Sequence, residues 1–276
     1  MNGSKFWLML ISGVWVVACG ATDIAREADF ADRIIKTLSI GEAVWLEVDG
    51  RKFLSLYTET EYPDIKEAAI ILHDKDAHPD RKPLIHGLRT ELPKHRWSTL
   101  ALQMPIREAG AESEDYFAMF TDATSRIRAA VRFLESKDYE NIVIVGHGLG
   151  ALMALQAQSD LQGDVKALAM IGVSVPAAGH KAAQTTAFIK QTQMPLLDLF
   201  SSRDIPEVTD SAAKRRLAAK DNKDYRQVSI DDDDTMIVKR LYSWLRHAME
   251  AHTSVENGKE VVEKEPTKNE VGALDN

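Results

Sequence analysis

The most constraining feature of this sequence is a glycine-rich turn that separates a β-branched run from a run of helix formers. Residues Asn141–Val145 read Asn-Ile-Val-Ile-Val, the turn Gly146–Gly150 reads Gly-His-Gly-Leu-Gly, and Ala151–Ala157 read Ala-Leu-Met-Ala-Leu-Gln-Ala. β-branched residues favour strands, whereas alanine, leucine and methionine favour helices. Glycine tolerates both close backbone approach and positive φ. The pattern therefore predicts a strand, a sharp turn and a helix in direct succession.

Composition limits the architecture and the partners. The chain has 276 residues, of which 45% are hydrophobic and 28% charged. This balance predicts one compact α/β domain of roughly 200 residues with flanking segments. The net charge of −8 argues against a nucleic-acid partner, because phosphate binding needs a concentrated basic face. The basic triplet Lys214–Arg216 is predicted to be the solvated side of a helix.

The first residues are typical of a secretion signal. Met1–Ala18 carries one positive charge, at Lys5, followed by the uncharged apolar stretch Phe6–Ala18. That stretch has the length of a signal peptide's apolar region and is too short to span a bilayer. We therefore expect residues 1–18 to be removed.

The only cysteine, Cys19, follows directly after Val16-Val17-Ala18. This order resembles the lipobox of bacterial lipoproteins, in which the cysteine is lipidated and becomes the mature N-terminus. The resemblance implies a Gram-negative envelope, and Gly20 in place of aspartate favours the outer membrane. The alternative is a chance cysteine in a signal peptide that is cut after Gly20 or Ala21. Without a second cysteine no intramolecular disulfide can form.

The folded part is predicted to begin with a helix and a hairpin. Apolar residues at helical spacing predict a helix over residues 22–38. Two β-prone runs, residues 43–48 and 52–57, then flank Asp49-Gly50, which is a strong hairpin signal. An antiparallel pair therefore opens the sheet.

Strands and helices alternate after the hairpin. Short apolar runs separated by helical patterns predict a mostly parallel sheet with helices on both faces. An antiparallel start followed by such units is the strand order of the α/β-hydrolase fold. The predicted strands are residues 68–73, 98–103, 141–146, 165–171, 195–200 and 225–230, and the predicted helices are residues 83–92, 117–136, 149–158, 181–190, 211–220 and 235–252.

These patterns divide the chain into four parts. Residues 1–18 are the lipoprotein-type signal, 19–41 an N-terminal helix or spacer, and 42–252 the α/β-hydrolase-like domain. Residues 253–276 are rich in glutamate, lysine and asparagine and lack periodicity, so they are predicted to form a disordered tail.

In α/β-hydrolases the strand, glycine-rich turn and helix form the nucleophile elbow, Gly-x-Ser-x-Gly. Here Gly148 stands in the serine position, so the atom that would attack a carbonyl is missing. The acid position, after the strand 195–200, holds Asp204. The histidine position falls within Asp231–Asp234, which contains no histidine. The elbow therefore predicts hydrolase architecture without hydrolase chemistry.

Several segments together resemble the bacterial α/β-hydrolase-like family known as domain of unknown function 3530. The resemblance implies the fold and an envelope location, and it implies no substrate. Family members tend to carry a Gly-Ala-Asp-His-type turn after the last strand, where this chain has Ser229–Thr235. The matching segments are Ile71–Asp74, Ala77–Asp80, Leu88-Arg89, Trp97–Pro105, Gly146–Gly150, Met194–Phe200, Ser202–Asp204, Tyr225–Gln227 and Trp244-Leu245.

His73 and Asp74 close the strand that supplies one oxyanion donor in hydrolases. The resemblance places the backbone amides near Asp74 and Leu149 around that pocket, together with Gly148, where a small anion or carbonyl could be held. The alternative is that His73 is only a hydrogen-bonded residue at a strand end. For His147, inside the elbow, we expect a packing or hydrogen-bonding role.

Other side chains offer less specific signals. Ser174 at a strand end and His180 in the following loop could supply a displaced nucleophile and base, with Asp204 as the acid. Position alone recommends them. For Asp204 itself we expect a turn-capping role.

Metal binding is not predicted. His78 and His86 flank Asp80 and Arg81, but no cysteine or paired carboxylate lies at ligand spacing. Asp231–Asp234 lacks the central glycine of a calcium loop, so we expect a solvated loop that caps the next helix.

The leading hypothesis is an envelope-anchored pseudo-hydrolase that binds a protein or a lipid-like ligand and needs no cofactor. Its membrane contact would be the lipid on Cys19. One alternative is an esterase with the relocated Ser174, His180 and Asp204. Another is a structural envelope module whose tail recruits partners.

Overall fold

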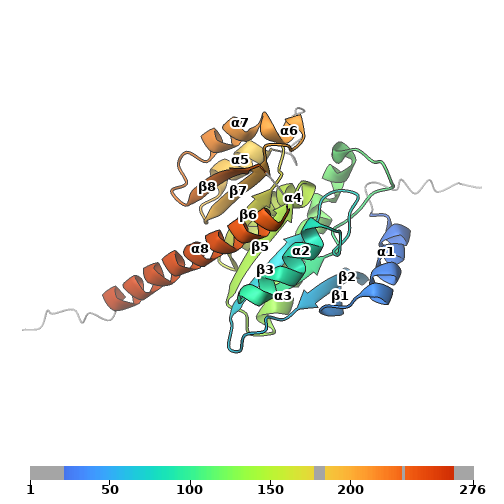
Figure 1. The fold of residues 1–276 in the computed structure, drawn as a ribbon, viewed down its shortest axis with the longest axis horizontal. Helices are drawn as coiled ribbons and strands as arrows, with labels where there is room; N and C mark the ends of the chain where they lie inside the picture. Colours follow the sequence, from blue (N-terminus) through green and yellow to red (C-terminus); the bar gives the residue numbers. More distant parts are fainter. Residues whose placement is uncertain (1–21, 177–183, 232–233, 264–276) are drawn as a thin grey trace, which may run out of the picture.

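The computed structural model describes residues 22–176, 184–231 and 234–263. The signal peptide, Cys19, His180 and residues 264–276 lie outside the described residues. An eight-stranded sheet of order β1-β2-β4-β3-β5-β6-β7-β8 forms the centre of the molecule (Figure 1). The strands are β1 (Glu42–Val48), β2 (Arg51–Thr58), β3 (Glu67–Leu72), β4 (Ser98–Leu102), β5 (Asn141–His147), β6 (Val165–Ile171), β7 (Leu196–Ser201) and β8 (Tyr225–Ile230).

The strand directions confirm the predicted sheet. β2 pairs antiparallel with both β1 and β4, and every pairing from β4 onward is parallel. The β1–β2 hairpin turns at Asp49 and Gly50, whose φ angles of 50° and 75° are the positive values that a tight hairpin turn requires. Parallel strands bring their carboxyl ends to one edge of the sheet, which is where ligands bind in open α/β sheets.

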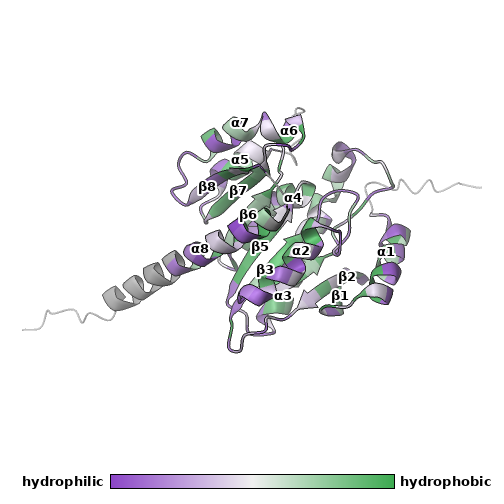
Figure 2. Ribbon diagram, in the orientation of Figure 1, coloured by the Kyte–Doolittle hydropathy of each residue, from purple (hydrophilic) through white to green (hydrophobic). Residues whose placement is uncertain are grey.

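Helices cover both faces of the sheet, and each face has its own apolar core. Helices α1, α2 and α8 pack on one face, and α3, α4 and α5 on the other. Figure 2 shows that the central strands are the most hydrophobic part, as expected for strands buried on both faces. The bounds of these helices are α1 (Ile24–Thr37), α2 (Leu84–Glu91), α3 (Phe120–Glu135), α4 (Leu149–Ala157), α5 (Thr185–Gln191) and α8 (Asp234–Glu263), with the shorter α6 (Pro206–Thr209), α7 (Ala212–Ala218) and the 3-10 turns η1 (Leu92–His95), η2 (Ser113–Met119) and η3 (Gln158–Leu161).

Helix α1 is part of the domain. Thr22 exchanges hydrogen bonds with the backbone of Ile106, and the Ile34 side chain is buried in the core. Glu27 is also buried, where it pairs with Arg126 of α3 at 3.1 Å and accepts a hydrogen bond from Thr22. Burial raises the pKa of Glu27, although the Arg126 charge opposes that shift. The segment predicted as a helix or spacer is thus fixed to the sheet.

Two expectations need correction. The helix predicted to end at His252 continues to Glu263, because no proline interrupts it before Pro266 and extending a formed helix needs no new nucleation. Its last part extends away from the sheet (Figure 1). The first residues of the predicted disordered tail are therefore helical.

The second correction concerns the basic triplet Lys214–Arg216. Arg215 is fully buried, and its Nε donates to Asp198 of β7 at 2.8 Å. A carboxylate inside the strand, which the local pattern did not reveal, draws this one side chain inward while its two neighbours stay exposed.

Among residues 22–176, 184–231 and 234–263, no helix combines the length and apolarity that a membrane crossing needs.

Candidate functional site

The predicted site residues gather at the carboxyl edge of the parallel strands. His73 and Asp74 follow β3, the elbow ends β5, and Asp204 follows β7. The strands β3 and β5 are direct neighbours in the sheet, so Asp74 and Gly148 face each other at the same edge.

The turn at Gly148 is fixed in an unusual backbone conformation. Its φ and ψ are 52° and −118°, a combination that side chains other than glycine rarely adopt. Its N–H donates to the carbonyl of Ile171 at 2.9 Å, which ties the elbow to β6. The β3 and α4 backbones also approach closely, since a Cβ on Gly150 would overlap the His73 carbonyl. The elbow is thus built as a strained turn between packed elements.

The carboxylate of Asp74 occupies the space that a side chain at Gly148 would need. A Cβ at position 148 would approach the Asp74 carboxyl carbon and both oxygens closer than 3.0 Å, a separation that real Cβ atoms essentially never show. A serine at Gly148 and the present position of Asp74 therefore exclude each other.

Asp74 is held there by two backbone amides. Its Oδ1 accepts hydrogen bonds from the N–H groups of Leu149 and Lys75, each at 2.7 Å. Leu149 is the first residue of α4, so the carboxylate also lies at the positive end of a helix. We call these two N–H groups the amide cradle. In a hydrolase the N–H after the nucleophile belongs to the oxyanion hole, and here an internal carboxylate fills that position.

His73 positions this arrangement in its neutral form. Its Nε2 accepts from the N–H of Met104 at 3.0 Å, so the proton is on Nδ1, which donates to the carbonyl of Asp74 at 2.7 Å. Burial lowers the pKa of His73 to about 3. The imidazole therefore links the backbone that follows β3 to the backbone that follows β4 through two hydrogen bonds.

The remaining hydrolase positions do not assemble into a triad within the described residues. Asp204 accepts the N–H of Ser201 at 2.8 Å and donates its own N–H to the Ser201 carbonyl, so it closes a turn after β7. The backbone carbonyl of Ser174 accepts a hydrogen bond from the Thr185 hydroxyl at 3.1 Å. The imidazole of His147 lies beside Gly172, near Asp204, and has no hydrogen bond in the described part of the chain. No described imidazole contacts the Ser174 hydroxyl.

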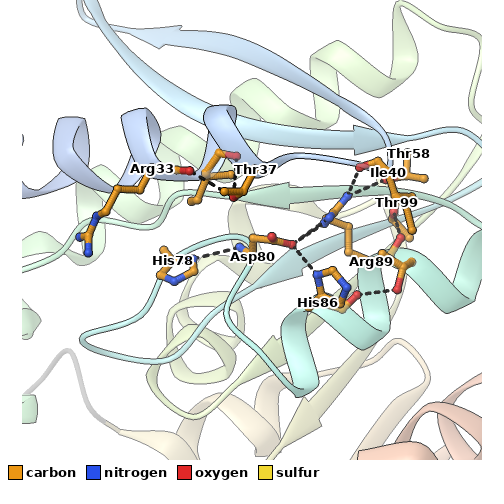
Figure 3. Close-up of polar contacts among 11 residues, drawn as sticks. Arg33, Thr37, Ile40, Thr58, His78, Asp80, His86, Arg89 and Thr99 are labelled. Atoms are coloured by element: carbon orange, nitrogen blue, oxygen red, sulfur yellow. Dashed lines mark hydrogen bonds and ion pairs between the residues drawn. The ribbon is translucent and has the colours of Figure 1, made fainter.

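A second polar cluster joins the loop between β3 and α2 to helix α2 itself (Figure 3). Asp80 accepts from His86 at 2.9 Å and from Arg89 at 2.8 Å. Burial acts to raise the pKa of Asp80, but the hydrogen bonds from His86 and Arg89 outweigh it and hold that pKa below its usual value. Arg89 is buried and also donates to the Ile40 carbonyl at 2.6 Å. This cluster anchors the loop.

His78 belongs to the same loop. Its Nδ1 accepts the N–H of Asp80 at 3.2 Å, and its ring packs on Phe30 of α1. Across the described ranges no cluster of three or more histidine, cysteine or acidic residues is arranged to hold a metal ion.

Sequence reasoning identified the elbow and its missing hydroxyl, but it missed the Asp74 side chain as the occupant of the cradle. An acidic residue directly after the strand that faces the elbow, together with a glycine at the nucleophile position, was the available signal.

Comparisons with known proteins agree with this architecture. A family described as a protein of unknown function (DUF3530) matches residues 23–123 and 111–239. No curated protein matches significantly. Est1E from Butyrivibrio proteoclasticus is 16% identical with a TM-score of 0.60, covering 75% of this chain and 99% of that chain. TT1662 from Thermus thermophilus is 16% identical with a TM-score of 0.61, covering 76% and 98%. The Pyrococcus furiosus esterase Pf2001 is 13% identical with a TM-score of 0.61, covering 75% and 91%. At these identities the structures share the fold.

Proposed function

The chain belongs to the DUF3530 family of proteins of unknown function, and we propose that it is a non-catalytic protein of the α/β-hydrolase fold that acts by binding. It is tethered to the bacterial envelope through a lipid on Cys19, and its ligand is an envelope protein or a lipid-like molecule. The Asp74 carboxylate in the amide cradle, opposite Gly148, is the observation that carries this proposal.

The chemistry of acyl transfer supports this conclusion. A serine hydrolase needs a nucleophile, an imidazole base and free donors for the oxyanion. Gly148 carries no hydroxyl, and the Leu149 amide is already bound to an anion. Loss of the nucleophile alone leaves at most about 10³–10⁴-fold acceleration over water in enzymes that retain a free oxyanion hole. Because Asp74 already occupies the amide cradle, the remaining rate acceleration should be lower still.

The envelope location rests on the N-terminal sequence. The uncharged apolar stretch Phe6–Ala18 ends in Val16-Val17-Ala18, directly before Cys19, which is the order expected of a lipobox. Diacylation of the cysteine together with an amide-linked acyl chain would place three acyl chains in the membrane. Each buried methylene of these acyl chains contributes about 0.8 kcal/mol, so the anchor would be stable.

A serine-directed fluorophosphonate probe tests the absence of catalysis. The full-length chain should not be labelled and should not hydrolyse p-nitrophenyl butyrate above the buffer rate, whereas a serine esterase assayed in parallel should do both. Labelling that disappears in Ser174→Ala would contradict the proposal and identify a relocated nucleophile.

Metabolic labelling with palmitate tests the anchor. The wild-type chain should incorporate the label and fractionate with membranes, and Cys19→Ala should do neither. Equal membrane fractionation of the two proteins would refute lipid anchoring at this cysteine.

A further inference from the structure

A cavity of about 260 Å³ opens beside the elbow, and Asp74 is not among the residues that line it. It lies between the carboxyl ends of β5, β6 and β7 and the first turns of α2 and α8. The elbow residue His147 and the turn residue Asp204 both line it, but none of its walls belongs to the amide cradle. The filled cradle therefore leaves this cavity accessible.

The polar groups of this cavity are predominantly cationic or hydrogen-bond donors. Arg81 and Lys82 stand at its rim, and neither side chain has an ion-pair or hydrogen-bond partner in the part of the chain that the structure describes. The Asp204 carboxylate is engaged by the Ser201 amide. Arg81 and Lys82 against Asp204 leave the lining with one net positive charge, in a chain whose total charge is −8, and this favours an anionic ligand.

The start of helix α2 adds two backbone donors. The N–H groups of Leu84 and Ile85, both residues of the cavity wall, have no acceptor among the described residues. They belong to the first turn of α2, where helix N–H groups lack an intrahelical partner. Leu84 and Ile85 line the same cavity as Arg81, so the cavity wall offers both backbone and side-chain donors.

The rim is held in place before any ligand arrives. Asp80 precedes Arg81 directly and is bound to buried Arg89, while His86 on the other side of the rim donates to the same carboxylate (Figure 3). The segment from Arg81 to Ile85 is thus fixed at both ends. Binding there would cost little ordering of the loop.

The inner wall is apolar. Ile85 of α2, Ile171 of β6 and Ile237 of α8 line it, and all three are buried. A ligand that fills the cavity must therefore combine an anionic group with a small hydrocarbon body.

We propose that this cavity, with Arg81 at its rim and the isoleucines on its wall, binds a small organic carboxylate with an apolar body. The carboxylate lies against Arg81 and the α2 amides, His147 donates a further hydrogen bond, and the hydrocarbon contacts Ile171 and Ile237. This inference rests on the proposed binding function and assigns it a site and a ligand class.

Titration calorimetry on the full-length chain in a non-ionic detergent tests it, with benzoate and hexanoate as probes and hexanamide as the uncharged control. Both carboxylates should bind, and hexanamide should bind at least tenfold more weakly. Arg81→Gln should weaken carboxylate binding about tenfold, because it removes a charge-assisted hydrogen bond. Arg81 is exposed, so this change should leave the fold intact.

Arg51→Gln is the matched control, since Arg51 is an exposed arginine that lines a different cavity. It should bind both carboxylates as the wild type does. No binding at millimolar concentrations, equal affinity for hexanamide, or equal losses in Arg81→Gln and Arg51→Gln would overturn the inference. These results are distinct from fluorophosphonate labelling, which would instead overturn the absence of catalysis.

Discussion

The mutual exclusion of Asp74 and a side chain at Gly148 makes a quantitative prediction about stability. Gly148→Ala adds only a methyl group, yet that group would overlap the Asp74 carboxylate. The carboxylate must then leave the amide of Leu149. In an Asp74→Ala background the same methyl group meets no carboxylate.

The magnitude follows from two separate costs. A residue other than glycine at φ 52° and ψ −118° costs about 1–3 kcal/mol. Loss of a hydrogen bond to a charged group costs about 1.5–3 kcal/mol. Gly148→Ala should therefore lower the free energy of unfolding by about 2.5–6 kcal/mol in the wild type, but by only about 1–3 kcal/mol when Asp74 is already alanine. The coupling between the two positions should be about 1.5–3 kcal/mol.

Urea unfolding followed by tryptophan fluorescence measures all four members of this double-mutant cycle. Gly50→Ala is the control for backbone strain alone, because Gly50 has a φ of 75° and nothing lies within 4 Å of its Cβ position. That change should destabilise the protein equally with or without Asp74. Additive effects of Gly148→Ala and Asp74→Ala, within about 0.5 kcal/mol, would refute the placement of the carboxylate.

Three further changes test the surroundings of the site. Because burial holds the pKa of His73 near 3, against 6.5 in the unfolded chain, only the unfolded state takes up this proton as the pH falls from 6.5. The contribution of neutral His73 to the free energy of unfolding should thus be fully present above pH 6.5 and be lost toward pH 3, by at most about 1.4 kcal/mol per pH unit. The urea midpoint of His73→Gln should decline less steeply over the same pH range. Asp80→Asn removes the carboxylate that pairs with the buried Arg89 and should cost about 3–5 kcal/mol in thermal unfolding, whereas Asp29→Asn, in an exposed pair, should cost under about 1 kcal/mol. Arg126→Met should release α1, detected as faster proteolysis within residues 24–37; unchanged protection would show that apolar packing alone holds the helix.

Much of the fold was predictable because it depends on local pattern. The β6 and β8 runs, Val165–Ile171 and Tyr225–Ile230, agree with their predicted bounds to the residue. Asp49-Gly50 located the hairpin through its turn chemistry. The short helix Pro206–Thr209 was missed, since a single helical turn carries too few residues to show periodicity.

The site was only half predictable, for a physical reason. The absence of a hydroxyl at Gly148 is written in the sequence, whereas the position of the Asp74 side chain depends on the contact between β3 and the elbow, across 74 residues of chain. Arg215 illustrates the same limit, because its burial depends on Asp198 in a different element. Pairings of this kind are set by tertiary packing, and no local periodicity reports them.

The shape of the elbow is set by packing, which requires the two glycines that flank Gly148. A Cβ at Gly146 would overlap the backbone of Ala151, and one at Gly150 would overlap the His73 carbonyl, so both positions serve the contact of α4 with the sheet. That contact also aims the Leu149 N–H at the strand end, where an unpaired donor would be costly to bury. Asp74 satisfies this donor from within the chain. It follows that a serine placed at Gly148 would not by itself rebuild a hydrolase, because the anion that stabilises the turn would have to leave first.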